Sequence, residues 1–156
     1  MGESFLLDVK NGNVKETLNS LWGDLLGKSL VDAVLIPQEH PSGKVIIQSF
    51  VTDPNKVKGS EPFAPFIPVN SARLISDITK VSPSKKKIAA VLRSCEIRAV
   101  VELAKLKQIN LENIILIGID CLGTYPTIRY EELKAAGQAT TEDFLKNMGE
   151  ARVEDG

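Results

Sequence analysis

The sequence predicts a single α/β domain with a mainly parallel sheet and helices on both faces. Two short apolar runs, "IAAVL" and "IILIGI", are typical of strands that helices cover on each side of a parallel sheet. The segment between them, "CEIRAVVELAKLKQ", repeats its apolar residues with helical spacing. A strand, a helix and a second strand in this order predict two parallel, neighbouring strands. The expected fold is therefore Rossmann-like, without the Gly-rich fingerprint GxGxxG.

The first expected helix lies in "NVKETLNSLWGDLLGKS". Asn13 followed by Glu16 has the form of a capping box at its start, and Gly27 is a stop signal at its end. The apolar residues that recur at helical spacing, and that we expect to face the core, are Val14, Leu18, Leu21 and Leu25. Next come "DAVLIPQ" and "GKVIIQSFV", two short strand-like runs around the turn "EHPSG", which predict a hairpin or a sheet edge.

A Pro-rich stretch separates this hairpin from the next helix. Prolines disfavour helix, so residues 53–69 are expected to form a long loop of the kind that often lines a site. Asn70 can cap the following helix, "SARLISDITKV", which Pro83 ends. The faces expected to be buried are Leu74, Ile75 and Ile78 in this helix, and Ile97, Val100, Val101 and Ala104 in the helix between the two apolar runs.

The last third of the chain is polar. It contains two weak helical patterns, "RYEELKAA" and "TEDFLKNM", and residues 131–156 are expected to form a peripheral tail. Residues 1–156 as a whole suit one domain, because 156 residues with 43% hydrophobic content can bury roughly two thirds of the unfolded surface.

Charge and composition exclude several classes of protein. The chain has 19 basic and 20 acidic residues, so it has no positive surface for nucleic acid. No apolar run approaches the roughly 20 residues of a membrane span, and the start lacks a signal sequence, so we expect a cytoplasmic protein. Two cysteines without CxxC spacing fit a reducing compartment rather than a disulfide framework.

The two cysteines follow the two apolar strands. Cys95 lies just beyond "IAAVL" and Cys121 just beyond "IILIGI", so both are expected at the carboxyl edge of one parallel sheet. Open α/β sheets bind ligands at this edge. A cysteine at a helix amino end also has its thiolate stabilised by free N–H groups, and Arg93 and Arg98 would add to this.

Several interpretations of the cysteines remain open on the residues alone. They are small core residues, a metal or cluster site, a nucleophile, or a disulfide switch. A tetrahedral metal or a cubane needs about four ligands, whereas this chain offers two cysteines and His40, which is expected at the surface. A nucleophile lacks a nearby base.

Two segments carry a resemblance to a known family. "LRSCEIRAVVELAKL" and "ILIGIDCLGTYP" resemble the paired cysteine segments of the beta subunits of coenzyme F(420)-reducing hydrogenases and formate dehydrogenases. Weaker likeness covers "SLVDAVLIP" and "PFIPVNSARL", so it spans Ser29 to Pro126. The resemblance implies an iron-sulfur flavoprotein, an oxidoreductase subunit that passes electrons between a 4Fe-4S cluster and FAD or a hydride carrier such as the deazaflavin coenzyme. Other subunits of a redox complex would be its partners.

The resemblance also implies roles for particular residues. Cys95 and Cys121 match cluster ligands, while Asn70, Ser94 and Arg98 match segments that form the flavin crevice. Family members are longer and carry further cysteines, so this chain corresponds to their N-terminal portion and supplies an incomplete ligand set. It is expected to be a fragment or shortened relative, to take ligands from a partner, or to keep the fold without its cofactors. The alternative is a non-catalytic α/β module that binds a partner or a ligand and keeps both cysteines in its core.

Overall fold

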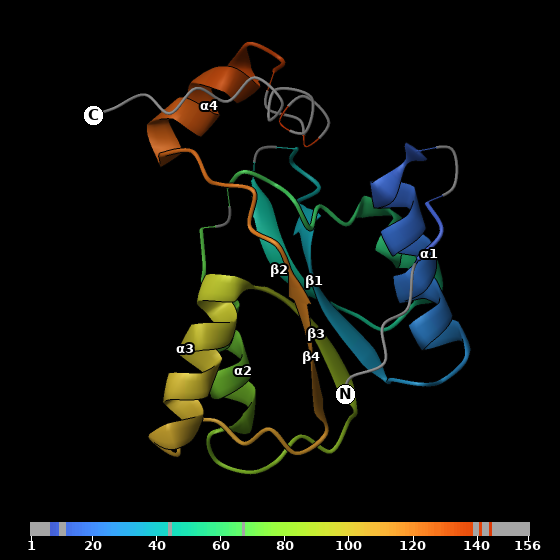
Figure 1. Ribbon diagram of the computed structural model, residues 1–156, viewed down its shortest axis with the longest axis vertical. Helices are drawn as coiled ribbons and strands as arrows, with labels where there is room; N and C mark the ends of the chain where they lie inside the picture. Colours follow the sequence, from blue (N-terminus) through green and yellow to red (C-terminus); the bar gives the residue numbers. More distant parts are fainter. Residues whose placement is uncertain are drawn as a thin grey trace.

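The sheet is mainly parallel, as expected. The computed structural model describes residues 7–9, 12–43, 45–66, 68–138, 141 and 144 (Figure 1). The strands are β1 (Ala33–Glu39), β2 (Ile46–Val51), β3 (Ile88–Arg93) and β4 (Ile114–Ile119), in the order β2-β1-β3-β4. β1, β3 and β4 are parallel, and β2 is antiparallel to β1, which confirms the predicted hairpin.

Helices cover both faces of the sheet, which confirms the expected α/β architecture of a single domain. α1 (Val14–Gly27) lies on one face, and α2 (Ser71–Thr79) and α3 (Ser94–Lys105) lie together on the other (Figure 1). A short 3-10 helix, η2 (Pro54–Gly59), interrupts the Pro-rich loop and packs against α1. The last described helix, α4 (Thr127–Ala135), lies beyond the carboxyl ends of β3 and β4.

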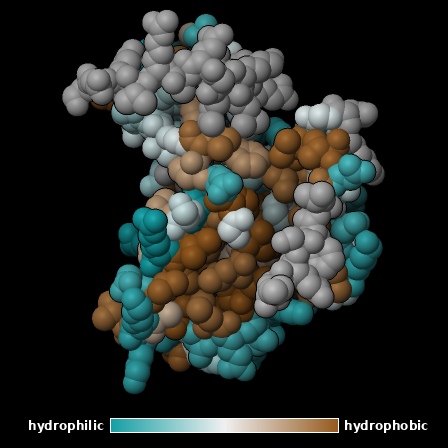
Figure 2. All heavy atoms as spheres, viewed as in Figure 1, coloured by the Kyte–Doolittle hydropathy of each residue, from teal (hydrophilic) through white to brown (hydrophobic). Residues whose placement is uncertain are grey.

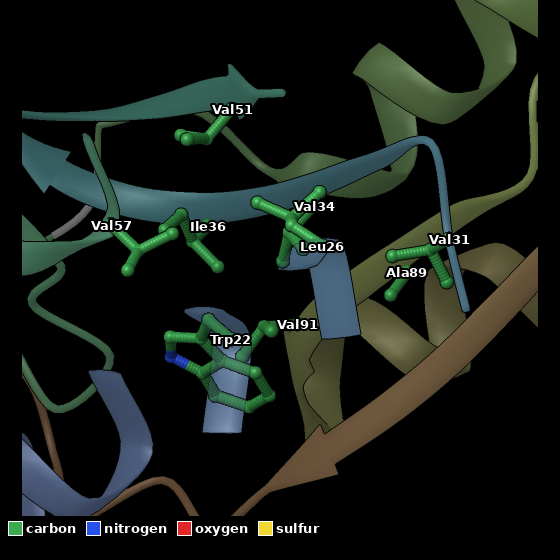
Figure 3. Packing of buried hydrophobic residues seen from close by; sticks show 9 residues of the cluster. All are labelled: Trp22, Leu26, Val31, Val34, Ile36, Val51, Val57, Ala89 and Val91. Carbon is green, nitrogen blue, oxygen red and sulfur yellow. The ribbon is translucent and has the colours of Figure 1, made fainter. Parts of the chain in front are cut away.

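α1 begins where the sequence predicts, because the Asn13 side chain accepts a hydrogen bond from the backbone N–H of Glu16 at 2.9 Å. Its buried stripe agrees in part with the expected one, because Leu18, Leu21 and Leu25 pack partly buried against the core. Trp22 and Leu26 are its most buried apolar residues, whereas Val14 is 39% exposed. Figure 3 shows how Trp22 and Leu26 pack with side chains of the sheet. The other residues in that cluster are Val31, Val34, Ile36, Val51, Val57, Ala89 and Val91.

The second apolar layer lies between the sheet and the α2–α3 pair. Ile75 of α2 and Val100 of α3 are fully buried there, as expected. Ile78 and Val101 were expected on the same faces but are 42% and 43% exposed. Successive helical residues are about 100° apart, so a neighbour of a central core residue already points to the side of the helix.

β4 is less buried than its composition suggests. All six residues of β3 are buried, whereas none of the six residues of β4 is, and Ile115 is 40% exposed. The expectation that helices cover both faces of this strand is met only in part, because Ile117 and Ile119 pack toward the α1 side and Ile114 and Leu116 toward the α2–α3 side without being fully buried. β4 is an edge strand, α3 covers one of its faces, and α1 packs mainly over β1 and β3.

The expected long loop and the C-terminal third are partly described. His40 is exposed in the hairpin turn, as expected. "RYEELKAA" lies largely in α4, but most of "TEDFLKNM" falls outside the described residues, and the peripheral character of residues 131–156 stays a prediction. Within the described ranges, no helix is both long enough and apolar enough to cross a membrane.

The core prediction concerns Trp22, which is 1% exposed and whose indole N–H has no hydrogen-bond partner. Trp22→Ala should lower the free energy of unfolding by about 3–5 kcal/mol, because it leaves a large cavity. Trp22→Phe should cost less than half of that, since it keeps most of the ring volume and removes an unsatisfied donor. Urea unfolding followed by far-ultraviolet circular dichroism measures both values. Equal losses for the two variants would contradict this account of the core.

Candidate functional site at the carboxyl ends of β3 and β4

The structure brings the two cysteines to equivalent positions on neighbouring strands. β3 and β4 are paired in parallel, with Arg93 opposite Ile119. Cys95 and Cys121 each lie two residues beyond this pair, so both leave the sheet at the same edge. Both thiols are free and exposed. The interpretation of the cysteines as core residues is therefore wrong.

A buried carboxylate organises the backbone beside Cys95. Glu96 is 5% exposed and lies in the first turn of α3. Its Oε1 accepts hydrogen bonds from the backbone N–H of Ser71 at 2.8 Å and from the Ser71 hydroxyl at 2.6 Å. Its Oε2 accepts from the backbone N–H of Arg93 at 2.9 Å. One side chain thus satisfies donors at the amino ends of both α2 and α3.

These bonds bring together the two segments that, according to the family resemblance, form a flavin crevice. Ser71 is the first residue of α2, directly after Asn70, and Ser94 is the first residue of α3. Asn70 caps α2, since its Oδ1 accepts from the backbone N–H of Ala72 at 2.9 Å. Asn70, Ser94 and Arg98 are all exposed. The structure places these residues on two adjoining helix ends, but nothing in it tests whether they bind a flavin.

Arg93, the last residue of β3, is buried at the same edge of the sheet. It is 5% exposed, and its guanidinium donates a hydrogen bond to the carbonyl of Ala64 in the Pro-rich loop. Among the described residues, no carboxylate forms an ion pair with it. The backbone N–H of Tyr125 also donates to the carbonyl of Pro65 at 2.8 Å. The loop is therefore held between the end of β3 and the segment after β4, which agrees with the expectation that it lies beside the site.

α4 covers this loop. Tyr130 of α4 is 2% exposed and stacks on Phe66 with ring centroids 4.8 Å apart. A cavity of about 440 Å³ lies between α4, the loop and the hairpin. Its lining residues are Lys15, Glu39, Ile46, Glu61, Ala64, Pro65, Tyr130, Lys134, Gly137 and Thr141. None of the site residues predicted from the sequence lies in this lining.

The charged groups of this cavity are paired with one another. Lys15 and Thr141 both bond to Glu61, and Lys134 forms an ion pair with Glu39 at 2.9 Å. They leave no uncompensated charge to attract an ionic ligand. Elsewhere, Lys80 lowers the pKa of Asp77 by a hydrogen bond of 2.9 Å, but this pair is exposed near the carboxyl end of α2, away from the cysteines.

The two glycines near Cys121 have structural roles that their sequence positions do not reveal. A Cβ added at Gly118 would lie 3.0 Å from Cδ1 of Ile97, so a glycine here lets α3 pack closely on β4. Gly123 has a φ of +110°, which other residues rarely adopt. Both glycines are therefore explained by packing and backbone conformation without a bound ligand.

The thiols do not make a complete metal site within the described residues. There, no three His, Cys, Asp or Glu side chains are grouped so that they could hold a metal ion. Cys95 and Cys121 supply two of the roughly four ligands that a tetrahedral metal or a cubane requires. A complete cluster therefore does not fit the described part of the chain by itself.

The sequence alone did not predict the buried hydrogen bonds of Glu96 or the inward direction of the Arg93 side chain. The sequence did contain a signal for Glu96. This glutamate stands three residues after Arg93, the N-cap residue of α3, which is the acidic position of a capping box. Its bonds to Ser71 depend on how α2 and α3 pack, which no local pattern reveals. Arg93 was expected to act near Cys95, yet its guanidinium points to Ala64.

The chain matches no family model. It is similar to the F(420)-dependent formate dehydrogenase subunit beta of Methanocaldococcus jannaschii, with 35% identity over 111 residues. It is also similar to the F(420)-dependent formate dehydrogenase 1 subunit beta of Methanococcus maripaludis, with 32% identity over 142 residues. These matches cover 71% and 88% of this chain but 28% and 35% of the relatives, so the chain spans about a third of their length.

The Glu96 network gives a prediction about stability. Glu96→Ala should lower the free energy of unfolding by about 3–5 kcal/mol, because the donors of Ser71 and Arg93 stay buried without their acceptor. Glu96→Gln should have a smaller effect, since one amide oxygen still accepts. The matched control is Glu102→Ala on the same helix, where an exposed pair with Lys105 is removed and about 0.5 kcal/mol or less is expected.

Chemical denaturation of the three variants tests this prediction. Similar losses for Glu96→Ala and Glu102→Ala would show that the buried carboxylate does not hold the two helix ends.

Proposed function

We propose, from the similarity of this chain to the beta subunits of F(420)-dependent formate dehydrogenases, that it is an electron-transfer subunit, or part of one, in a complex of that kind. The subunit would pass electrons between an iron-sulfur cluster and a flavin or hydride carrier such as the deazaflavin coenzyme. The observation that carries the proposal is the pair of exposed thiols, Cys95 and Cys121, at equivalent positions on neighbouring parallel strands.

The exposed thiols support a redox site because thiolates are the protein ligands of iron-sulfur clusters. Cys95 and Cys121 leave the sheet in the same direction, and the bonds of Glu96 to Ser71 and Arg93 fix the backbone beside Cys95. The described residues supply only these two cysteine ligands. The sequence holds no third cysteine, so further thiolate ligands would have to come from outside this sequence.

The amino end of α3 supports the flavin part of the proposal. The first three backbone N–H groups of α2 already bond to Glu96 and Asn70, so α2 offers little to a phosphate. The amino end of α3 carries a partial positive charge, which would suit the phosphates of FAD. Arg98 is exposed in the second turn of α3 and has no ion-pair partner among the described residues. In this proposal, Asn70 and Ser94 position the flavin through their exposed polar groups, and Arg98 supplies a positive charge.

A second function, a non-catalytic module that binds a partner or a ligand, loses part of its support. It assumed that both cysteines pack in the core, whereas both are exposed. The disulfide switch keeps some support, because the thiols are free and lie at equivalent strand ends. Mild oxidation separates a disulfide switch from a cluster site. A switch loses both free thiols on oxidation even when no iron is present.

The proposed site is tested on protein that is purified without oxygen and supplied with iron, sulfide, FAD and a small thiol, which can fill the ligand positions that the two cysteines leave open. We expect the wild-type chain to retain iron and flavin, and Cys95→Ser and Cys121→Ser each to lose most of the bound iron, because each removes one of two thiolates. Ser82→Ala, at an exposed position in the loop before β3, is the control and should retain both.

The measurements are iron per chain, visible absorbance and flavin fluorescence after gel filtration. A wild-type chain that binds neither group, together with thiols that react freely with a thiol reagent, would contradict the proposal for this chain alone. Unchanged iron in both serine variants would contradict the assignment of the ligands.

A further inference from the structure

The outer edge of β4 has the properties of an association surface. No other strand in the described part of the chain pairs with this edge. The run "IILIGI" has no charged residue and no proline, the features with which natural proteins usually protect an exposed edge strand. Ile115 is 40% exposed, and Ile117 and Ile119 are only half-buried on the α1 side of the sheet. Figure 2 shows apolar side chains gathered over this part of the molecule.

The backbone direction of β4 follows from one hydrogen bond. The N–H of Ile88 donates to the carbonyl of Asn113 at 2.8 Å, so the carbonyl of Asn113 points toward β3. Backbone groups alternate in direction along a strand. The N–H and carbonyl groups of Leu116 and Gly118 therefore point to the open edge, where no described residue bonds to them and another strand could.

We propose that the occupant of this edge is a second copy of the chain, with the two β4 strands antiparallel around a two-fold axis at Ile117. In this register, Leu116 of each copy exchanges backbone hydrogen bonds with Gly118 of the other, which is a regular antiparallel pair. Ile117 then faces its own counterpart, and Ile115 faces Ile119 of the second copy. The two sheets join, and the half-buried isoleucines cover one another.

The contact between Ile97 and Gly118 gives this register an apolar neighbour on the α3 side. Cδ1 of Ile97 lies 3.0 Å from the place that a Cβ at Gly118 would take, so Ile97 fills the space beside this backbone. Leu116 of the second copy lies directly opposite Gly118 and points to the same side of the joined sheets. It therefore packs beside Ile97, and Gly118 has no side chain to obstruct it.

Charge favours an antiparallel second copy over a parallel strand. The side-chain amide of Asn113, just before β4, donates to the carbonyl of Ser84 at 2.9 Å, which brings the exposed run Lys85–Lys87 beside the start of β4. Asp120 is exposed at the other end of the strand. An antiparallel pair places Asp120 of each copy near the start of the other β4, where the three lysines outnumber the one exposed carboxylate of Glu112, whereas a parallel pair of copies would bring lysines together.

The test is the mass in solution, measured by size-exclusion chromatography with light scattering over a range of concentrations. We expect wild-type protein to approach twice the chain mass of 17.0 kDa as its concentration rises. Ile117→Lys should raise the dissociation constant about 100-fold, because two lysines meet at the axis. Val81→Lys, at a position that is 92% exposed in the loop before β3, is the matched control and should stay dimeric.

Two further measurements keep the test independent of folding defects. Ile115→Lys changes a more exposed residue of the same strand and should also give monomers with a native circular dichroism spectrum. Hydrogen exchange should be slow at the amides of Leu116 and Gly118 in the wild-type dimer and fast in both β4 variants. A wild-type mass of one chain at all concentrations, dimers that survive both β4 substitutions, or only open-ended aggregates would overturn the proposal.

Discussion

The carboxylate of Glu96 is the interaction on which the rest of the candidate site depends. It lies almost completely buried between the amino ends of two helices, and three hydrogen bonds from Ser71 and Arg93 hold it there. A buried carboxylate without donors would cost several kcal/mol. The positions of α2 and α3 are therefore coupled, because moving either helix leaves charge or backbone donors unsatisfied. Cys95 directly precedes Glu96, so the same bonds fix the backbone position of Cys95.

Two kinds of side chain lie at the carboxyl edge of the sheet: buried ones that stabilise the fold and exposed ones that can react. Glu96 and Arg93 are buried and use their polar atoms on the helix ends and on the Pro-rich loop. Cys95 and Cys121 are exposed and make no disulfide. These buried bonds hold the backbone beside Cys95 in place, and Cys121 lies two residues beyond the end of the paired strand β4. A site built from the two thiols requires such fixed positions.

The sequence predicted the parts of the fold that depend on local chemistry. Asn13 and Asn70 mark helix starts because their side chains accept backbone N–H bonds nearby, and the apolar runs of β3 and β4 predict parallel neighbours. It failed where burial depends on distant elements. "IILIGI" is typical of a strand covered on both faces, yet no local pattern reveals that β4 lies at the edge of the described sheet and is only half-buried. For the same reason the sequence found both cysteines but not the bonds of Glu96 to Ser71.

The open edge of β4 and the thiol site share one strand, and this limits how they can interact. Cys121 follows the carboxyl end of β4, and antiparallel pairing of two β4 strands sends their carboxyl ends in opposite directions. The cysteine pairs of two copies would then lie at opposite ends of the joined sheet. A second copy bound at this edge therefore does not complete a four-thiolate ligand set. If iron binds at Cys95 and Cys121, the remaining ligands must come from another subunit or from chain outside the described ranges.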